Sequence, residues 1–580
     1  MGLVLVVAST AITAVIPWFL RSAIDGLRAG APTSAIWLTA GNIVAVATFA
    51  AFLRYAMREI LNGVSRQIEY DLRNDLLKHL VSLDTTWFAS HRTGDIMARL
   101  TNDLNAVRMA AGPAIMYLTN TIAGAVFSLA FMLRIDPLLT LLALLPMVAL
   151  PVLTTYLGGL VHRRFDAVQE HFSTVTTHAQ ENLTGTRIVR AYRQETAEIE
   201  RFGELNEEYK RRNISLAKLY GTMHPLFALL AGIAAVVVLG VGGLLTLRGT
   251  ISVGAFVAFG LYLNLLTWPL IALGWVINLF QRGSASMARL AGILDARSVI
   301  TEPEPGVTVH LPPTTGGRSL EFRNVGFHFP TAGEREPRWI FRDVSFVVPA
   351  GHTLGVVGPT GSGKTTLMDL IPRLHDPQEG AILIDGVPVR DIPLHELRRE
   401  IGFVPQESLL FSDTIAANLG YGSADADSIE WSARTAQLHD TIESFPGGYE
   451  TMLGERGINL SGGQKQRASL ARALARRPSI VLLDDALSAV DTHTEAEILR
   501  GLHDALTART AVIASHRASA IRNADWIVVL DEGRIVEQGR HDDLMMAEGR
   551  YWALLRRQQL VESIEASDES ALATQGAVDV

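Results

Sequence analysis

Six long apolar runs in the first half of the chain restrict its fold more than any other feature of the sequence. Each run is close to the ~20 residues that a helix needs to cross a bilayer. Backbone polar groups in lipid must be bonded within their own segment, so the runs predict transmembrane helices. We expect these spans at residues 3–20, 36–53, 114–133, 138–160, 226–247 and 253–280.

The connections between the spans predict their orientation. Those after the first, third and fifth spans are short, whereas those after the second and fourth are long and rich in arginine. Basic connections stay in the cytoplasm, so both chain termini are expected there. The long connections keep helical periodicity, as in QIEYDLRNDLLKHLVSL at 67–83. We therefore expect the helices to continue well beyond the membrane.

A change in composition divides the chain. Residues 1–295 form the expected membrane domain, and a segment rich in Pro, Gly and Thr at 296–318 reads as a linker. Strand-like and helix-like runs alternate over 319–560, which predicts a soluble α/β domain. The acidic, weakly apolar residues 561–580 are expected to be a disordered tail.

Composition excludes several kinds of chemistry. The chain has no cysteine, which rules out disulfides, thiolate metal sites and cysteine nucleophiles. Its net charge of −8 gives no sign of a nucleic-acid partner.

The segment GPTGSGKT at 358–365 matches the phosphate-loop pattern in full. It follows the strand-like TLGVV and precedes the helix-like TLMDLIPRL, which is the context that the pattern requires. Glycines let backbone N–H groups face phosphate oxygens, Lys364 reaches the outer phosphates, and the Thr365 hydroxyl holds Mg²⁺. The sequence thus predicts that ATP and Mg²⁺ bind here. The expected nucleotide-binding residues are Gly358, Pro359, Thr360, Gly361, Ser362, Gly363, Lys364, Thr365 and Thr366.

A phosphate loop requires a further acid that holds Mg²⁺ at the end of a buried strand. The run SIVLLD at 479–484 ends at Asp484 and supplies it. Asp485 follows at the place of the group that orients the attacking water.

Between these motifs lies LSGGQKQR at 460–467, about a hundred residues after the phosphate loop. With it, nearly the whole chain resembles ATP-binding cassette (ABC) transporters, and more closely an exporter-type half-transporter. The resemblance implies an all-α six-helix transmembrane domain followed by an α/β P-loop NTPase nucleotide-binding domain. It also implies that two such domains enclose two ATP molecules. Ser461, Gly462, Gly463 and Gln464 would then contact ATP held by a partner chain.

The same resemblance implies roles for further residues. Phe329 stands where an aromatic ring stacks on adenine, although it can equally be a core residue of its strand. Gln406 matches the glutamine that approaches Mg²⁺, and His516 matches the histidine that touches the γ-phosphate. Asp491 lies where the family chain crosses the dimer interface, and residues 91–104 resemble the first intracellular coupling segment.

Asp485 departs from the family pattern, which has glutamate after the metal-binding aspartate. Its side chain is one methylene shorter, and a displacement of about 1 Å can cost about a hundredfold in rate. An impaired acid beside an intact LSGGQ is the pattern of one subunit in heterodimeric exporters. We therefore expect a different partner chain with glutamate at the matching place. The alternative is a homodimer in which Asp485 is catalytic.

The cargo expected from the spans is lipophilic or amphipathic, such as a drug, lipid or peptide. The last span carries aromatic residues and no charge, and no intramembrane acid suggests ion coupling. A regulatory or importing role remains an alternative within the exporter fold. Only five lysines occur, which favours a GC-rich bacterial genome and hence a bacterial cytoplasmic membrane as the location.

Overall fold

This computed structural model describes residues 1–330, 337–422, 425–454, 457, 460–487, 492–516 and 521–557. The chain divides into two compact units. One consists of Met1–Ser82 and His91–Ala296, and the other of Leu83–Ser90 and the described residues from Arg297 onward. The expected tail at 561–580 lies outside the described residues.

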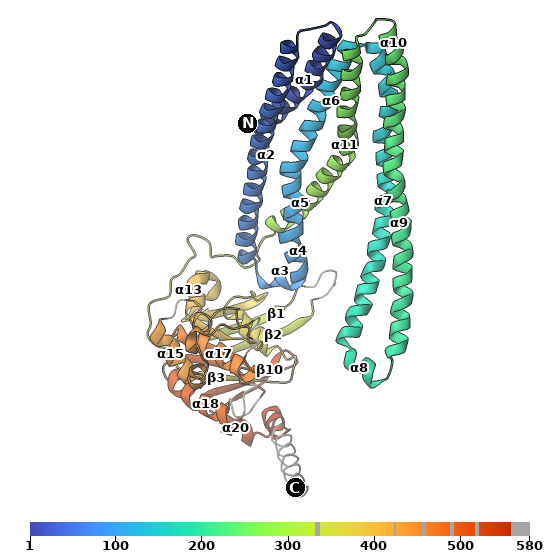
Figure 1. Ribbon diagram of the computed structural model, residues 1–580. Helices are drawn as coiled ribbons and strands as arrows, with labels where there is room; N and C mark the ends of the chain where they lie inside the picture. Colours follow the sequence, from blue (N-terminus) through green and yellow to red (C-terminus); the bar gives the residue numbers. More distant parts are fainter. Residues whose placement is uncertain are drawn as a thin grey trace. The chain divides into compact units, whose positions relative to one another are not determined.

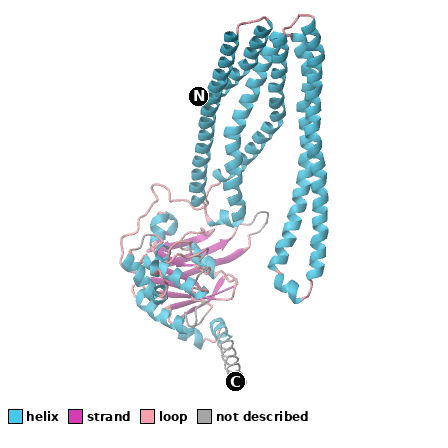
Figure 2. Ribbon diagram, viewed as in Figure 1, coloured by secondary structure: helices cyan, strands magenta, loops and turns pink. Residues whose placement is uncertain are grey.

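The first unit is entirely helical, as Figures 1 and 2 show. It contains six helical stretches long and apolar enough to cross a membrane, which confirms the six predicted spans. Its α-helices are α1 (Gly2–Arg28), α2 (Thr33–Ser82), α4 (Thr93–Ala98), α5 (Leu104–Met109), α6 (Ile115–Ile135), α7 (Pro137–Thr184), α8 (Thr186–Ala191), α9 (Glu195–Val237), α10 (Gly243–Leu247) and α11 (Val253–Leu294). Three π-helical turns, Arg99–Asp103, Ala110–Ala114 and Val238–Gly242, continue the helices next to them.

The three longest of these helices far exceed the length that a bilayer requires. Helix α2 has 50 residues, α7 has 48 and α9 has 43. At 1.5 Å per residue, α2 is roughly 75 Å long. The prediction that the basic connections extend the helices is confirmed.

Helices α1, α6 and α11 are joined by contacts between residues distant in the sequence. The buried Tyr262 hydroxyl donates to the Ala14 carbonyl oxygen at 2.8 Å, and its ring stacks on Phe131. Near the carboxyl end of α1, Asp25 accepts hydrogen bonds from the Ser252 hydroxyl at 2.6 Å and the Gly254 N–H at 2.9 Å. Because its hydroxyl has a hydrogen-bond acceptor, Tyr262 can be buried between these helices and hold them together.

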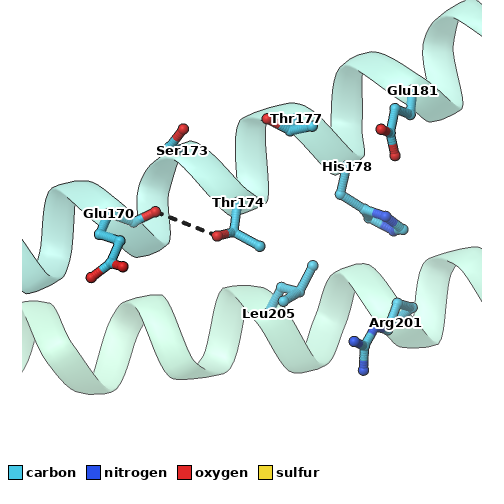
Figure 3. Close-up of a pocket in the computed structure, with 8 residues that line it drawn as sticks. All are labelled: Glu170, Ser173, Thr174, Thr177, His178, Glu181, Arg201 and Leu205. Atoms are coloured by element: carbon cyan, nitrogen blue, oxygen red, sulfur yellow. Dashed lines mark hydrogen bonds between the residues drawn. The ribbon is translucent and has the colours of Figure 1, made fainter. Parts of the chain in front are cut away.

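Helices α7 and α9 form an antiparallel pair (Figure 1). Arg164 donates to the Ser215 carbonyl oxygen at 2.8 Å, and near the turn the Asn182 amide donates to Glu198 at 2.8 Å. A hollow of about 660 Å³ lies between the two extensions. Figure 3 labels the residues that line it, which are Glu170, Ser173, Thr174, Thr177, His178 and Glu181 of α7 and Arg201 and Leu205 of α9.

The second unit contains two sheets (Figure 2). A six-stranded sheet has the order β10-β9-β3-β8-β7-β6, in which only β10 is antiparallel. A four-stranded antiparallel sheet has the order β2-β1-β4-β5. The strands are β1 (Leu320–His328), β2 (Trp339–Val348), β3 (Thr353–Val357), β4 (Glu379–Ile384), β5 (Val387–Pro388), β6 (Ile401–Val404), β7 (Ile480–Asp484), β8 (Thr510–Ala514), β9 (Trp526–Asp531) and β10 (Arg534–Gly539).

Helices cover these sheets. They are α12 (Lys364–Leu370), α13 (Leu394–Arg399), α14 (Ile415–Leu419), α15 (Ala426–Thr435), α16 (His439–Glu443), α17 (Gly462–Ala475), α18 (Thr492–Leu506) and α20 (His541–Met546). Strands β3, β7 and β8 are adjacent, parallel and almost wholly buried. Their carboxyl ends therefore meet at one edge, where open parallel sheets bind ligands.

Two segments expected elsewhere pack on the second unit. Helix α3 (Thr85–Ser90) belongs to it, and Thr85 donates to the Leu374 carbonyl oxygen at 2.8 Å. Residues 91–104, which resemble a coupling segment, belong instead to the first unit. At the end of the expected linker, Arg318 is 2% exposed and pairs with Asp385 and Glu400, both at 2.9 Å.

Candidate nucleotide-binding site

The phosphate loop connects β3 to α12. At Gly358, a Cβ atom would lie 2.0 Å from the Leu530 carbonyl oxygen, so only glycine fits against the neighbouring strand. Gly363 has φ +99°, which side chains rarely adopt, and a Cβ there would crowd Ile340 and Phe341 at 3.0 Å. These constraints fix the loop so that the first turn of α12 begins at Lys364.

Lys364 is buried beneath this loop. Its ammonium group donates to the carbonyl oxygens of Gly358 at 2.8 Å and Pro359 at 2.9 Å. Burial lowers the pKa of Lys364, while the charges of Asp484 and Asp485 oppose that shift. A cation held here by loop carbonyls is close to where outer phosphates would lie.

Asp484 ends strand β7 and is 2% exposed. Burial raises its pKa, and the charge of Asp485 adds to this; a hydrogen bond with Thr365 acts in the opposite direction. Its Oδ2 atom has no hydrogen-bond partner in the described part of the chain. A buried carboxylate oxygen without a donor, beside a threonine hydroxyl, suits a hard divalent cation. The residues present therefore fit Mg²⁺.

Asp485 follows in the left-handed backbone region, with φ +48°. Its N–H donates to the Ala514 carbonyl oxygen at 2.8 Å, and its Oδ1 accepts a long hydrogen bond of 3.4 Å from the His516 N–H. Aspartate tolerates this conformation better than most residues do. Burial lowers the pKa of the His516 imidazole, as does the positive charge of Lys364.

These side chains share one cavity of about 290 Å³. The structure brings together most predicted residues of the phosphate site. It also places residues there that the sequence reading missed, namely Ile340 from β2 and Ala514 and Ser515 beside His516. Ser515 lies between the end of β8 and the predicted residue His516, and this position could have indicated it. Nothing in the sequence around Ile340 indicates a place in the site. The residues that line the cavity are Ile340, Thr360, Gly361, Gly363, Lys364, Thr365, Thr366, Gln406, Asp484, Asp485, Ala514, Ser515 and His516.

The other predicted residues do not line this cavity. Phe329 is 42% exposed and packs edge-on against Phe327 and His375. Ser461 caps α17, where its hydroxyl and the Gln464 side chain form a reciprocal capping box. Gly462 and Gly463 are the first residues of that helix. Asp491 lies outside the described residues.

Sequence comparison agrees with this arrangement. Residues 1–270 match the family model described as ABC transporter transmembrane region, and residues 341–488 match the model described as ABC transporter. The chain belongs to the ABC transporter family. It combines the two ABC modules in one half-transporter with six spans, and its nucleotide-binding domain is an ABC transporter ATPase domain.

Individual ABC transporters resemble the chain over most of its length. A probable multidrug resistance ABC transporter ATP-binding/permease protein, YheI of Bacillus subtilis, is 37% identical and covers 97% of this chain and 96% of its own. An ATP-dependent lipid A-core flippase of Syntrophus aciditrophicus is 35% identical over 86% of this chain and 82% of its own. A solved structure of a bacterial Atm1-family ABC exporter with ATP bound matches with a TM-score of 0.76 and 28% identity. The match covers 96% of this chain and 97% of the chain of that exporter.

Proposed function

We propose that this chain forms one half of a dimeric exporter that uses ATP to move a lipophilic or amphipathic compound out of the cytoplasm. The observation that carries the proposal is the separation of two nucleotide motifs. Lys364 and Asp484 line the phosphate cavity, whereas Ser461, at the start of α17, does not. In this proposal, the LSGGQ segment of a second chain completes the phosphate cavity, which is the arrangement that the family resemblance implies.

The cavity residues have distinct roles in this proposal. The phosphate loop and Lys364 hold the phosphates, while Thr365, Gln406 and Asp484 hold Mg²⁺. The metal ion supplies charge neutralisation at the β- and γ-phosphate oxygens. Asp485 and His516 both line the cavity, where the His516 N–H donates to the Asp485 carboxylate, and they would position water and the γ-phosphate.

The partner in this proposal is a different half-transporter. Asp485 is shorter than the glutamate expected at its place, and its carboxylate is already near the His516 backbone N–H. The site built on this chain would then hydrolyse ATP slowly, and the intact LSGGQ would complete a faster site on the partner. The alternative is a homodimer that uses Asp485 in both sites.

The names of similar proteins support the choice of cargo. One relative is named as a probable multidrug resistance transporter and another as a lipid A-core flippase. We place the complex in a bacterial cytoplasmic membrane with both termini in the cytoplasm. The arginine-rich helical extensions that follow the second and fourth spans support this orientation.

The deciding experiment is the native mass of the complex after gentle extraction of a tagged chain from its own membrane. We expect two different half-transporter chains. Two identical chains would refute the heterodimer and leave the homodimer. ATP-dependent uptake of an amphiphile into inverted vesicles that contain the complex would support export. ATP-dependent movement in the opposite direction would support an importer.

A further inference from the structure

Helices α1, α2, α6 and α11 of the first unit enclose a cavity of about 440 Å³. Its size is within the range of sites that hold small organic ligands. The four helices lie together in Figure 1, and each contributes polar residues. The polar lining residues used below are Thr10 and Thr13 from α1, Arg54 and Arg58 from α2, Tyr117 and Asn120 from α6, and Asn264 from α11.

The cavity has a net positive charge. Arg54 and Arg58 both line it, and its lining contains no aspartate or glutamate. Arg54 donates to the Thr13 hydroxyl oxygen at 2.9 Å, and Arg58 makes no hydrogen bond with any described residue. Across the described part of the chain, no carboxylate lies within ion-pair distance of either guanidinium group.

The two arginines occupy defined positions along α2. The apolar run of α2 ends at Leu53, directly before Arg54. Arg58 follows four residues later, about 6 Å along the helix and on the same face. Both arginines therefore come directly after the expected apolar span, and α2 continues beyond them for a further 24 residues to Ser82.

The rest of the lining combines polar and apolar groups. The Thr10 hydroxyl lies 2.9 Å from the Asn120 Oδ1 atom, and Asn264 faces the same cavity. The Tyr117 ring packs edge-on against Trp275, and Met57 and Met116 are buried beside it. A ligand here would meet hydrogen-bond donors at one part and apolar surface at another.

We infer that this cavity binds an amphiphile with an anionic head group, a carboxylate, phosphate or sulfate, and that Arg54 and Arg58 determine this specificity. Charged residues at the bilayer are costly unless they are paired, and an anionic head group supplies the partner that the chain itself lacks. The apolar tail would remain among the methionines and Tyr117. This inference rests on the proposed function, because it specifies the cargo of the exporter.

The test is equilibrium binding to the purified complex in nanodiscs without ATP. Three fluorescent probes with one 12-carbon tail carry a phosphate, a phosphocholine or a trimethylammonium head, and binding to empty nanodiscs is subtracted. We expect the phosphate probe to bind at least about tenfold more tightly than the other two. Competition by inorganic phosphate separates recognition of the free anion from recognition of the amphiphile, and we expect none.

Variants then assign the selectivity to the two arginines. Arg54→Gln and Arg58→Gln should each weaken binding of the phosphate probe by about tenfold and leave the phosphocholine probe unchanged. Arg58→Lys should retain most of the selectivity. The matched control is Arg66→Gln on the same helix, since Arg66 pairs with Glu69 at 2.9 Å outside the cavity. Arg58 has no hydrogen bond to lose, so its variant is informative even if Arg54→Gln disturbs folding.

Equal affinity for the three probes, or an unchanged preference in Arg58→Gln, would overturn the inference. Transport measured in parallel keeps the two proposals separate. Charge-selective binding without ATP-dependent movement would refute export and leave the site, whereas movement without charge selectivity would leave export and refute the site.

Discussion

Asp484 and Asp485 are neighbours in the sequence but lie in different surroundings. Asp484 is held rigidly at the end of a buried strand, with one carboxylate oxygen lacking a donor. Asp485 turns away through a left-handed backbone, and its carboxylate accepts a hydrogen bond from the N–H of His516, two residues after the end of strand β8. The fold thus separates an acid suited to Mg²⁺ from one suited to a water molecule or a neighbouring backbone group.

Asp485→Glu should raise the rate of ATP hydrolysis by the assembled complex by about ten- to a hundredfold at the site built on this chain. The added methylene corrects a displacement of about 1 Å, which is the basis of that magnitude. Phosphate release at saturating ATP measures it, with Asp484→Asn as a control that should abolish hydrolysis at the same site. Unchanged turnover would show that the shorter acid is no impairment.

Most side chains of the phosphate site could be predicted because their order follows from strand–loop–helix patterns. The conformation of Asp485 could not, since φ +48° depends on the strand beside it. The contribution of Ile340 was equally hidden, because it comes from a separate sheet. The adenine contact of Phe329 stays a prediction.

At the scale of elements, helix α3 shows what periodicity cannot reveal. The sequence predicts a coupling segment at 91–104, which belongs to the first unit, and this role stays a prediction; residues 83–90, which carried no such signal, belong to the second unit. A short helix of six residues has too few turns to display an apolar face. Its contact depends on hydroxyls, with Thr86 lying 3.2 Å from a ring nitrogen of His375.

This contact should be sensitive to acid. Burial lowers the pKa of His375 below its ordinary value of 6.5, although Asp84 and Asp376 oppose the shift. The unfolded chain then binds more protons than the folded one, so stability falls as pH drops through 6.5 and below. His375→Gln should abolish that part of the fall in Tm between pH 7.5 and 5.5, measured on the full complex.

The control for this prediction is His352→Gln, which alters an exposed histidine of the same unit whose ring lies 3.2 Å from its neighbouring Ala350 carbonyl oxygen. Its pH dependence should equal that of the unaltered chain. If His375→Gln shows the same fall as well, protonation of His375 does not loosen this contact.

At the scale of the whole molecule, the two-part organisation was predictable because bilayer and water select different compositions. The six spans and their long extensions followed from apolar runs and basic connections. The polar cavity could not be predicted in this way, because its lining residues, such as Arg54 and Asn264, come from helices that are distant in the sequence. Tyr262, an aromatic residue of the last span, is buried between helices.

Ser461 should matter chiefly to the partner's ATP site. Ser461→Ala removes the cap of α17 and should cost about 1 kcal/mol of stability. Ser461→Asp keeps a capping oxygen but places a negative charge where phosphate would approach. We expect both variants to lower total ATP turnover of the complex at least about tenfold, while only Ser461→Ala lowers Tm. Full turnover in Ser461→Asp would show that this helix end closes on no nucleotide.

The pairing of α7 with α9 also has a consequence for biosynthesis. All residues of this antiparallel pair precede residue 238, and the hydrogen bonds that join the pair, such as Arg164 with Ser215 and Asn182 with Glu198, lie within α7 and α9 themselves. A ribosome therefore completes both partners before it has made α11 or any strand of the ATPase domain. The α7–α9 pair can therefore form while the nascent chain is still being inserted into the membrane.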